Sequence, residues 1–179
     1  MMTFDIDSYQ VIGISAVVIA YGSLLYFTRK RADFSKLLYF GFFLWGFLHF
    51  LASGLSINGQ VLYGIVVLPI SEVLSILRFD QIIHIVGFGA TTLFVYELIE
   101  SKLTNIDKFS LGFVIAMAGL GIGASNEILE FFVSFFVPSN KVGGYVNNSL
   151  DLVADLLGAL LVLPIIFSRE NKKSTTQTN

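Results

Sequence analysis

The 179-residue sequence contains no cysteine. This absence excludes disulfide bonds, thiolate nucleophiles, iron–sulfur clusters and cysteine-ligated zinc sites. Any bound metal would therefore need carboxylate, amide, imidazole or water ligands. Charged residues are also scarce, at 13% of the chain, and the formal net charge is −2. The sequence shows no basic patch and no glycine-rich phosphate loop, so we expect no nucleic-acid partner.

Hydrophobic residues make up 55% of the chain, and its mean hydropathy is +0.77. They occur in long stretches separated by short charged runs, a pattern that would expose far too much apolar surface in water. The first ten residues, MMTFDIDSYQ, are acidic, and no small-residue cleavage site follows the first apolar stretch. We therefore predict an all-α, polytopic membrane helix bundle whose first apolar segment is a retained span rather than a signal peptide.

Five apolar segments are each near or above the roughly 20 residues that a helix needs to cross about 30 Å of hydrocarbon. They comprise residues 9–27, 37–57, 80–98, 109–137 and 148–167. A further apolar segment, residues 60–77, contains Gly64, Pro69 and Glu72 and is predicted to be interfacial or re-entrant. Residues 1–168 are expected to form a single transmembrane helical domain, followed by a disordered cytoplasmic tail over residues 169–179.

The distribution of lysine and arginine predicts the orientation, because cytoplasmic loops of membrane proteins carry an excess of these residues. With five spans, one side of the membrane holds only Arg78 and Lys141. A sixth span over residues 60–77 would abolish this bias. We therefore predict five spans with the N-terminus outside and the C-terminus inside, in a prokaryotic cytoplasmic membrane. The opposite side holds nine basic residues: Arg29, Lys30, Arg31, Lys36, Lys102, Lys108, Arg169, Lys172 and Lys173.

Each of the last three predicted spans carries a pair of ionisable residues toward its outer end. A spacing of three or four residues places each pair on one helix face. Intramembrane charges cost on the order of 2.5–3.5 kcal/mol each, and clustered carboxylates repel one another, so protons, Arg78 or a bound cation must neutralise them. The pairs are Asp80 with His84, Glu127 with Glu130, and Asp151 with Asp155.

Structural explanations exist for several of these residues taken singly. Asp151 lies in a first helical turn, where a carboxylate favours the helix dipole. Asp80 could pair with Arg78, and His84 could be a hydrogen-bonded packing residue. His49, in the second span, is also predicted to be a packing residue. We expect Tyr63 to be an interface anchor, and Glu97 and Glu100 to be solvated at the inner boundary.

The last three spans carry three motifs in order: Asp80-x-x-x-His84, Asn126-Glu127-x-x-Glu130, and Asn147-Asn148-x-x-Asp151-x-x-x-Asp155-x-x-Gly158-Ala159. Over about residues 78–160 these motifs resemble those of the VanZ-like superfamily, and of its uncharacterised YjdF-type inner-membrane members in particular. The resemblance implies no established reaction. Glu130 stands where Gln or another polar residue is common in that superfamily, and Asp155 stands where Asn is common. These departures make the site more acidic and favour a bound cation.

We predict a divalent-metal-dependent enzyme, a hydrolase or transferase, that acts on a lipid or lipid-linked headgroup at the outer face. Carboxylates and one imidazole can hold Mg²⁺, Mn²⁺, Ca²⁺ or Zn²⁺ and leave a position open for water. The alternatives are a cation or proton transporter, for which five spans would need to oligomerise, and a non-catalytic accessory protein with a structural polar cluster. The predicted catalytic residues are His84, Glu127 and Asp80, the metal ligands are Glu127, Glu130, Asp151, Asp155 and His84, and the supporting residues are Arg78, Asn126, Asn147 and Asn148.

Overall fold

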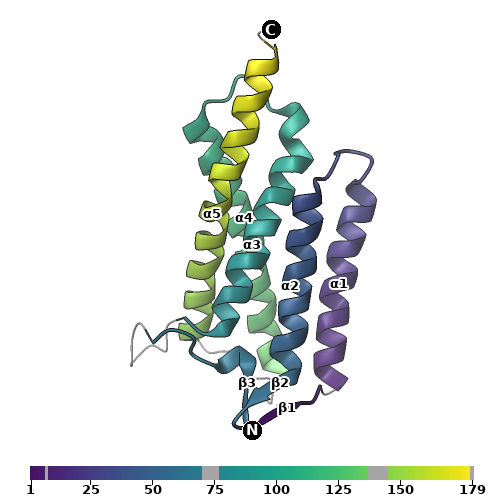
Figure 1. The fold of residues 1–179 in the computed structure, drawn as a ribbon, viewed down its shortest axis with the longest axis vertical. Coiled ribbons are helices and arrows are strands. Elements are labelled where there is room, and N and C mark those ends of the chain that lie inside the picture. Colours follow the sequence, from purple (N-terminus) through teal and green to yellow (C-terminus); the bar gives the residue numbers. More distant parts are fainter. Residues whose placement is uncertain (7, 70–76, 137–144, 178–179) are drawn as a thin grey trace.

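The computed structural model describes residues 1–6, 8–69, 77–136 and 145–177. Five long helices run side by side and alternate in direction, so the two ends of the chain lie at opposite ends of the bundle (Figure 1). We refer to the end that holds the N-terminus as the N-terminal end. The helices are α1 (Ser8–Thr28), α2 (Lys36–Gly54), α3 (Phe79–Ile99), α4 (Lys108–Phe136) and α5 (Tyr145–Gln177).

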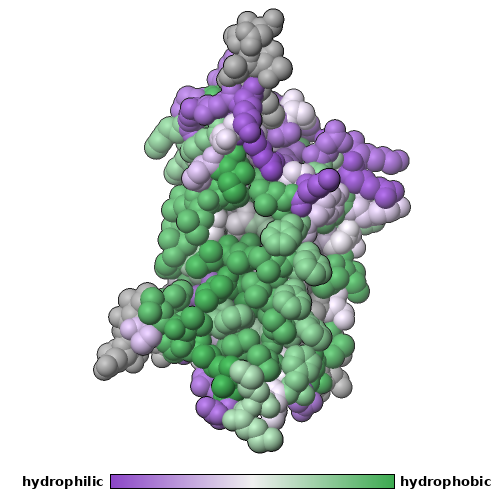
Figure 2. Space-filling model, viewed as in Figure 1, coloured by the Kyte–Doolittle hydropathy of each residue, from purple (hydrophilic) through white to green (hydrophobic). Residues whose placement is uncertain are grey.

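The surface of the bundle is that of a membrane protein. Figure 2 shows hydrophobic side chains over its middle, with hydrophilic ones gathered at its ends. Within the described residues, α1 contributes a shorter apolar stretch, Val18–Thr28, and four other segments are long and apolar enough to cross a membrane. The prediction of an all-α membrane bundle is therefore confirmed. The four segments are Lys36–Gly54, Phe79–Lys102, Lys108–Phe132 and Tyr145–Lys172.

Two helix ends differ from the predicted spans. The helix α2 ends at Gly54, because Leu55–Ile57 forms strand β2 between β1 (Met2–Phe4) and β3 (Gln60–Val61). A tight turn joins β2 to β3, with positive φ at Asn58 (53°) and Gly59 (81°), the backbone that an Asn-Gly hairpin turn requires. At the other end of the chain, α5 continues through Gln177. Residues 169–177 are therefore helical, although we predicted a disordered tail over residues 169–179.

The segment between α2 and α3 is described only in part. After β3, a 3-10 turn covers Leu62–Gly64, and Val66 pairs with Arg78 as an isolated antiparallel bridge. Val66 and Arg78 therefore lie side by side just before α3 begins. Residues 70–76 of the predicted interfacial or re-entrant element lie outside the described residues.

Helix α3 lies at the centre of the bundle and packs against α2, α4 and α5. Its contact with α5 depends on two glycines. A Cβ atom on Gly158 of α5 would lie 2.9 Å from the Gly89 backbone nitrogen and would also collide with the Ile85 carbonyl oxygen. These small residues let the two backbones approach closely, as small residues do at transmembrane helix interfaces. The close approach brings the polar residues of α3 and α5 into contact.

An ion pair with a buried carboxylate joins α3 and α5 at the end opposite the N-terminus. Glu97 of α3 is only 3% exposed and pairs with Arg169 of α5. Ser35, just before α2, donates its backbone N–H to Glu97 at 2.9 Å and accepts from Arg169 at 3.1 Å. We predicted a solvated Glu97, and that prediction is wrong. Its partner Arg169 lies on the part of α5 that we predicted to be a tail.

Candidate functional site

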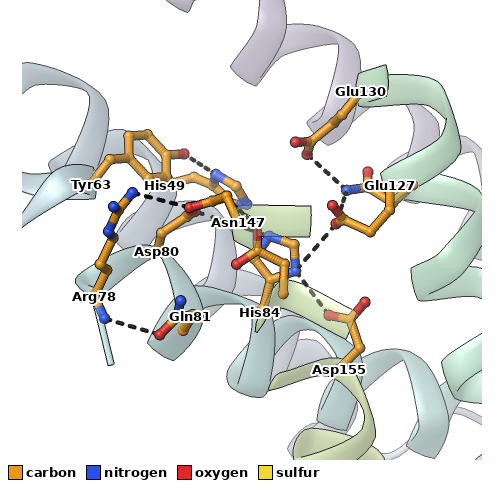
Figure 3. Close-up of polar contacts among 12 residues, drawn as sticks. His49, Tyr63, Arg78, Asp80, Gln81, His84, Glu127, Glu130, Asn147 and Asp155 are labelled. Atoms are coloured by element: carbon orange, nitrogen blue, oxygen red, sulfur yellow. Dashed lines mark hydrogen bonds and ion pairs between the residues drawn. The ribbon is translucent and has the colours of Figure 1, made fainter. Parts of the chain in front are cut away.

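The polar residues of α3, α4 and α5 gather around His84 at the N-terminal end of the bundle (Figure 3). His84 and Asp155 are buried, and Asp151 is fully buried. Glu127, from the part of α4 that returns to this end, is 4% exposed. Asp80 is the most accessible acid in contact with His84, with 22% of its side chain exposed. The predicted convergence of the three helices is thus present in the fold.

Both ring nitrogens of His84 face carboxylates. Its Nδ1 atom lies 2.8 Å from Asp155 Oδ1, a hydrogen-bond distance, and 3.7 Å from Glu127 Oε1. Its Nε2 atom lies 4.0 Å from Asp80 Oδ1, beyond hydrogen-bond range. The imidazole therefore lies between Asp155, to which it is hydrogen-bonded, and Asp80, which is too far away for a hydrogen bond.

His84 belongs to two groups of residues that could hold a metal ion. The first group combines Asp80, His84 and Asp151, and the second combines His84, Glu127 and Asp155. In each group the potential ligand atoms lie within 4.8 Å of one another. Four of the five predicted ligands thus belong to one group or the other. Asp80, which we predicted to be catalytic, is a further member of the first group. The fifth, Glu130, belongs to neither; its carboxylate accepts a hydrogen bond from Asn126 at 2.9 Å.

Several buried acceptors of the cluster have no hydrogen-bond partner within the described part of the chain. They are Glu127 Oε2, Asp151 Oδ1 and Asp155 Oδ2. A buried carboxylate oxygen without a partner lowers the stability of the fold by on the order of 1–3 kcal/mol or more, because it has lost its hydrogen bonds to water without forming new ones. Three buried carboxylate oxygens near one imidazole therefore lack hydrogen-bond partners within the described residues.

The predicted supporting residues connect the acids to the bundle. Asn147 donates to Asp151 and, at 3.4 Å, to Asp80, while its oxygen accepts from Arg78 at 3.1 Å. Asn126 also reaches Glu127, at 3.4 Å. The remaining residue, Asn148, donates to the Glu127 backbone carbonyl at 3.4 Å and so ties α5 to α4.

A second histidine, His49 of α2, borders the site together with Tyr63 (Figure 3). The Tyr63 hydroxyl and His49 Nδ1 form a short hydrogen bond, and Trp45 packs edge-on against the imidazole. Burial raises the pKa of Tyr63, so its hydroxyl stays protonated and can donate. Sequence reasoning placed Tyr63 at the interface and missed this pair, because two strands and the turn between them separate the two residues and no regular spacing links them.

Comparison with known proteins identifies the family of the chain. No curated protein and no solved structure matches the chain. The family described as "Predicted membrane protein (DUF2238)" matches residues 3–172, which covers nearly the whole chain, including all the site residues. The protein is therefore a member of this family of predicted membrane proteins.

Proposed function

We propose that Asp80, His84 and Asp151 bind a divalent metal ion and that this site catalyses a hydrolysis or transfer reaction on a lipid or lipid-linked headgroup. The observation that carries the proposal is the two-sided environment of His84. Its Nδ1 atom is 2.8 Å from Asp155, whereas its Nε2 atom faces Asp80 across 4.0 Å. We place the ion on this wider side, next to Nε2.

The hydrogen bond to Asp155 assigns the histidine tautomer. Nδ1 faces two acceptors, Asp155 and Glu127, so it carries the proton. Nε2 is then free to present its lone pair to a metal. Metal-ligating histidines commonly donate their other ring N–H to a carboxylate, which fixes the ring orientation and raises the basicity of the ligand. Asp155 supplies that carboxylate here.

The charge balance supports the same ligand set. Asp151 is fully buried, and its Oδ1 atom has no partner within the described residues. Together with Asp80 it would place two negative charges beside one neutral imidazole in a low-dielectric region. A divalent cation neutralises both carboxylates and satisfies the unpartnered oxygen.

Glu127 lies on the Nδ1 side of His84, and we assign it a role in proton transfer. Its Oε1 atom lies 3.7 Å from His84 Nδ1, and its Oε2 atom is buried without a partner. It is not among the three proposed ligands, so its carboxylate is available as a general base. A bound divalent ion would supply Lewis acidity and an activated water in such a site. Mg²⁺, Mn²⁺, Ca²⁺ and Zn²⁺ all accept this donor set.

The topology proposed for the protein is five spans with the N-terminus outside. The basic residues Arg29, Lys102 and Arg169 lie at the end opposite the N-terminus, where the positive-inside rule places the cytoplasm. The site would then open toward the outer leaflet of a prokaryotic cytoplasmic membrane, where lipid and lipid-linked headgroups are accessible.

Metal analysis of the purified full chain tests the proposal. We expect about one equivalent of a divalent ion in the wild type and in Glu130→Gln, the matched control outside both metal groups. We expect its loss in Asp80→Asn and Asp151→Asn, and a 10–100-fold weaker affinity in Asp155→Asn. Glu127→Gln should keep the metal but abolish turnover of membrane lipids, followed by mass spectrometry in reconstituted vesicles.

Three other outcomes would contradict parts of the proposal. Loss of the ion in Glu127→Gln but not in Asp80→Asn would move the ligand set to the other side of His84. A wild type that binds no divalent ion under any condition would refute the metal-enzyme proposal. Metal-dependent cation flux without lipid turnover would favour a transporter.

A further inference from the structure

Within the described residues, Arg78 is the only lysine or arginine at the N-terminal end of the bundle. It precedes α3, and its guanidinium donates to Asn147 Oδ1 at 3.1 Å. No aspartate or glutamate oxygen in the described part of the chain lies within the 4.0 Å of an ion pair with it. A guanidinium has five N–H donors. Among the described residues, the only partner of the Arg78 guanidinium is Asn147.

The Asn147 side chain lies between the Arg78 guanidinium and two acids, Asp80 and Asp151. Its oxygen faces Arg78, while its amide nitrogen contacts Asp80 at 3.4 Å and also bonds to Asp151. The guanidinium is thus one side chain away from two of the three proposed metal ligands (Figure 3). An anion bound by Arg78 would lie beside the metal ion.

Gln81 offers a second donor next to Arg78. Its Oε1 atom accepts the Arg78 backbone N–H at 3.0 Å, which orients the amide at the start of α3. Its Nε2 atom is buried and has no hydrogen-bond partner among the residues that the structure describes, and the whole residue is 3% exposed. A buried amide N–H₂ requires an acceptor. The positive end of the α3 dipole favours a negatively charged one.

Exposed apolar residues lie directly beside this charged end. The backbone N–H of Val67 bonds to the Leu77 carbonyl at 2.9 Å, and Val66 pairs with Arg78, so Val67 lies close to Arg78. Val67 is 50% exposed and Leu68 is 54% exposed. An amphiphile could therefore place its charged group at Arg78 and its chains along this apolar surface.

We infer that Arg78 and Gln81 form the subsite for the phosphate group of a phosphate-bearing lipid; this inference rests on the proposed function and specifies its substrate class. Arginine matches phosphate oxygens in two-point contacts, and the Gln81 amide adds a third donor. Five carboxylates line the neighbouring cluster, and they would repel a phosphate in the absence of a cation. The phosphate and the metal ion should therefore bind with positive, reciprocal coupling.

Calorimetric titration of the full chain in detergent tests the inference with dioctanoyl phosphatidic acid as the probe. Dioctanoylglycerol, which lacks the phosphate, and inorganic phosphate, which lacks the chains, are the comparison ligands. We expect binding of the phosphatidic acid in the presence of Mn²⁺ and about 10–100-fold weaker binding in Arg78→Gln. Arg78→Lys, which keeps the charge but loses the two-point contact, should fall between the two.

Controls separate the subsite from the metal site and from folding. Arg29→Gln removes a cation at the opposite end of the bundle and should bind like the wild type. Arg78→Gln and Gln81→Met should both keep the Mn²⁺ content of the wild type. Fast ³¹P relaxation of the bound phosphatidic acid by Mn²⁺ should show that the phosphate lies beside the metal.

The remaining outcomes distinguish this inference from the proposed function. If the wild type holds Mn²⁺ and Arg78→Gln binds the phosphatidic acid as tightly as the wild type does, the phosphate subsite is refuted and the metal site stands. If Arg78-dependent binding occurs and the wild type binds no divalent ion under any condition, the subsite stands and the metal-enzyme proposal is refuted. Equal affinity for inorganic phosphate would refute the lipid as the source of the phosphate.

Discussion

The Nδ1 atom of His84 lies 2.8 Å from Oδ1 of Asp155, although 71 residues separate the two in the sequence. Both side chains are buried, with 7% and 0% of their surface exposed. This contact fixes the ring of the histidine relative to α5. The rest of the cluster is arranged around it, with Glu127 on the same side of the ring and Asp80 on the other.

Removal of the metal should lower the unfolding temperature of the wild type. It should also reverse the effect of Asp151→Asn on that temperature. With a chelator present, we expect Asp151→Asn to unfold at a higher temperature than the wild type. The substitution removes an uncompensated intramembrane charge, worth up to about 3 kcal/mol. With saturating metal the wild type should be the more stable protein, because a ligand that binds only the folded state stabilises it. Differential scanning fluorimetry measures both. A lower midpoint for the metal-free variant would make Asp151 a structural residue.

Replacement of Gly158 by valine should separate α3 from α5. The new side chain would collide with the backbone at Gly89 and Ile85, so we expect a loss of about 1–3 kcal/mol in the free energy of unfolding. The loss should be accompanied by weaker metal binding, since the His84–Asp155 contact depends on the same approach. Gly121→Val is the matched control, because nothing lies within 4 Å of a Cβ atom at Gly121. Equal effects of the two substitutions would show that the close approach is unimportant.

The Glu97–Arg169 ion pair should stabilise the fold without contributing to the site. Arg169→Met leaves the buried Glu97 carboxylate without its cation, and we expect a loss of about 3 kcal/mol. The double substitution Glu97→Met with Arg169→Met should recover much of this loss, because no buried charge is then left alone. Unfolding in a denaturing detergent reports the free energies. Metal content should stay at the wild-type value in every folded variant, and a change in it would contradict the separation of the two ends.

The orientation can be tested with a single introduced cysteine, because the native sequence has none to give background labelling. Thr3→Cys lies in exposed strand β1, and Ser101→Cys lies in an exposed turn at the opposite end. A membrane-impermeant maleimide should label the first variant in intact cells and the second only after permeabilisation. The reverse pattern would place the N-terminus inside and would turn the proposed site toward the cytoplasm.

Contacts within one helix were predictable, whereas contacts between helices were not. Asp80 and His84 are four residues apart, so helical geometry alone puts them on one face. Whether His84 contacts Asp151 or Asp155 depends on how α5 is rotated against α3, and the Gly158 contact with α3 determines that rotation. Glu127 and Glu130 share a face, yet only Glu127 points at the histidine. The sequence pattern does not predict this difference between Glu127 and Glu130.

At the end of the bundle opposite the N-terminus, the amino-acid composition led to a wrong prediction for Glu97. Glu97 lies near the predicted boundary of an apolar span, a position that normally means contact with water. Its partner Arg169 comes from the continuation of α5 past residue 168, in a segment whose polar composition is typical of a tail. A charged residue can lie in the interior when a distant helix extends far enough to pair with it.

The two contacts between α3 and α5 also determine which part of the site is free to move. Both helices begin at the N-terminal end and run in the same direction (Figure 1). One contact joins His84 to Asp155, and the other joins Glu97 to Arg169 about 20 Å further along the pair. Helices fastened at two such distant points cannot tilt or slide independently, so they form one rigid body. A displacement of α4, which carries Glu127, would therefore leave the mutual geometry of Asp80, His84 and Asp151 unchanged.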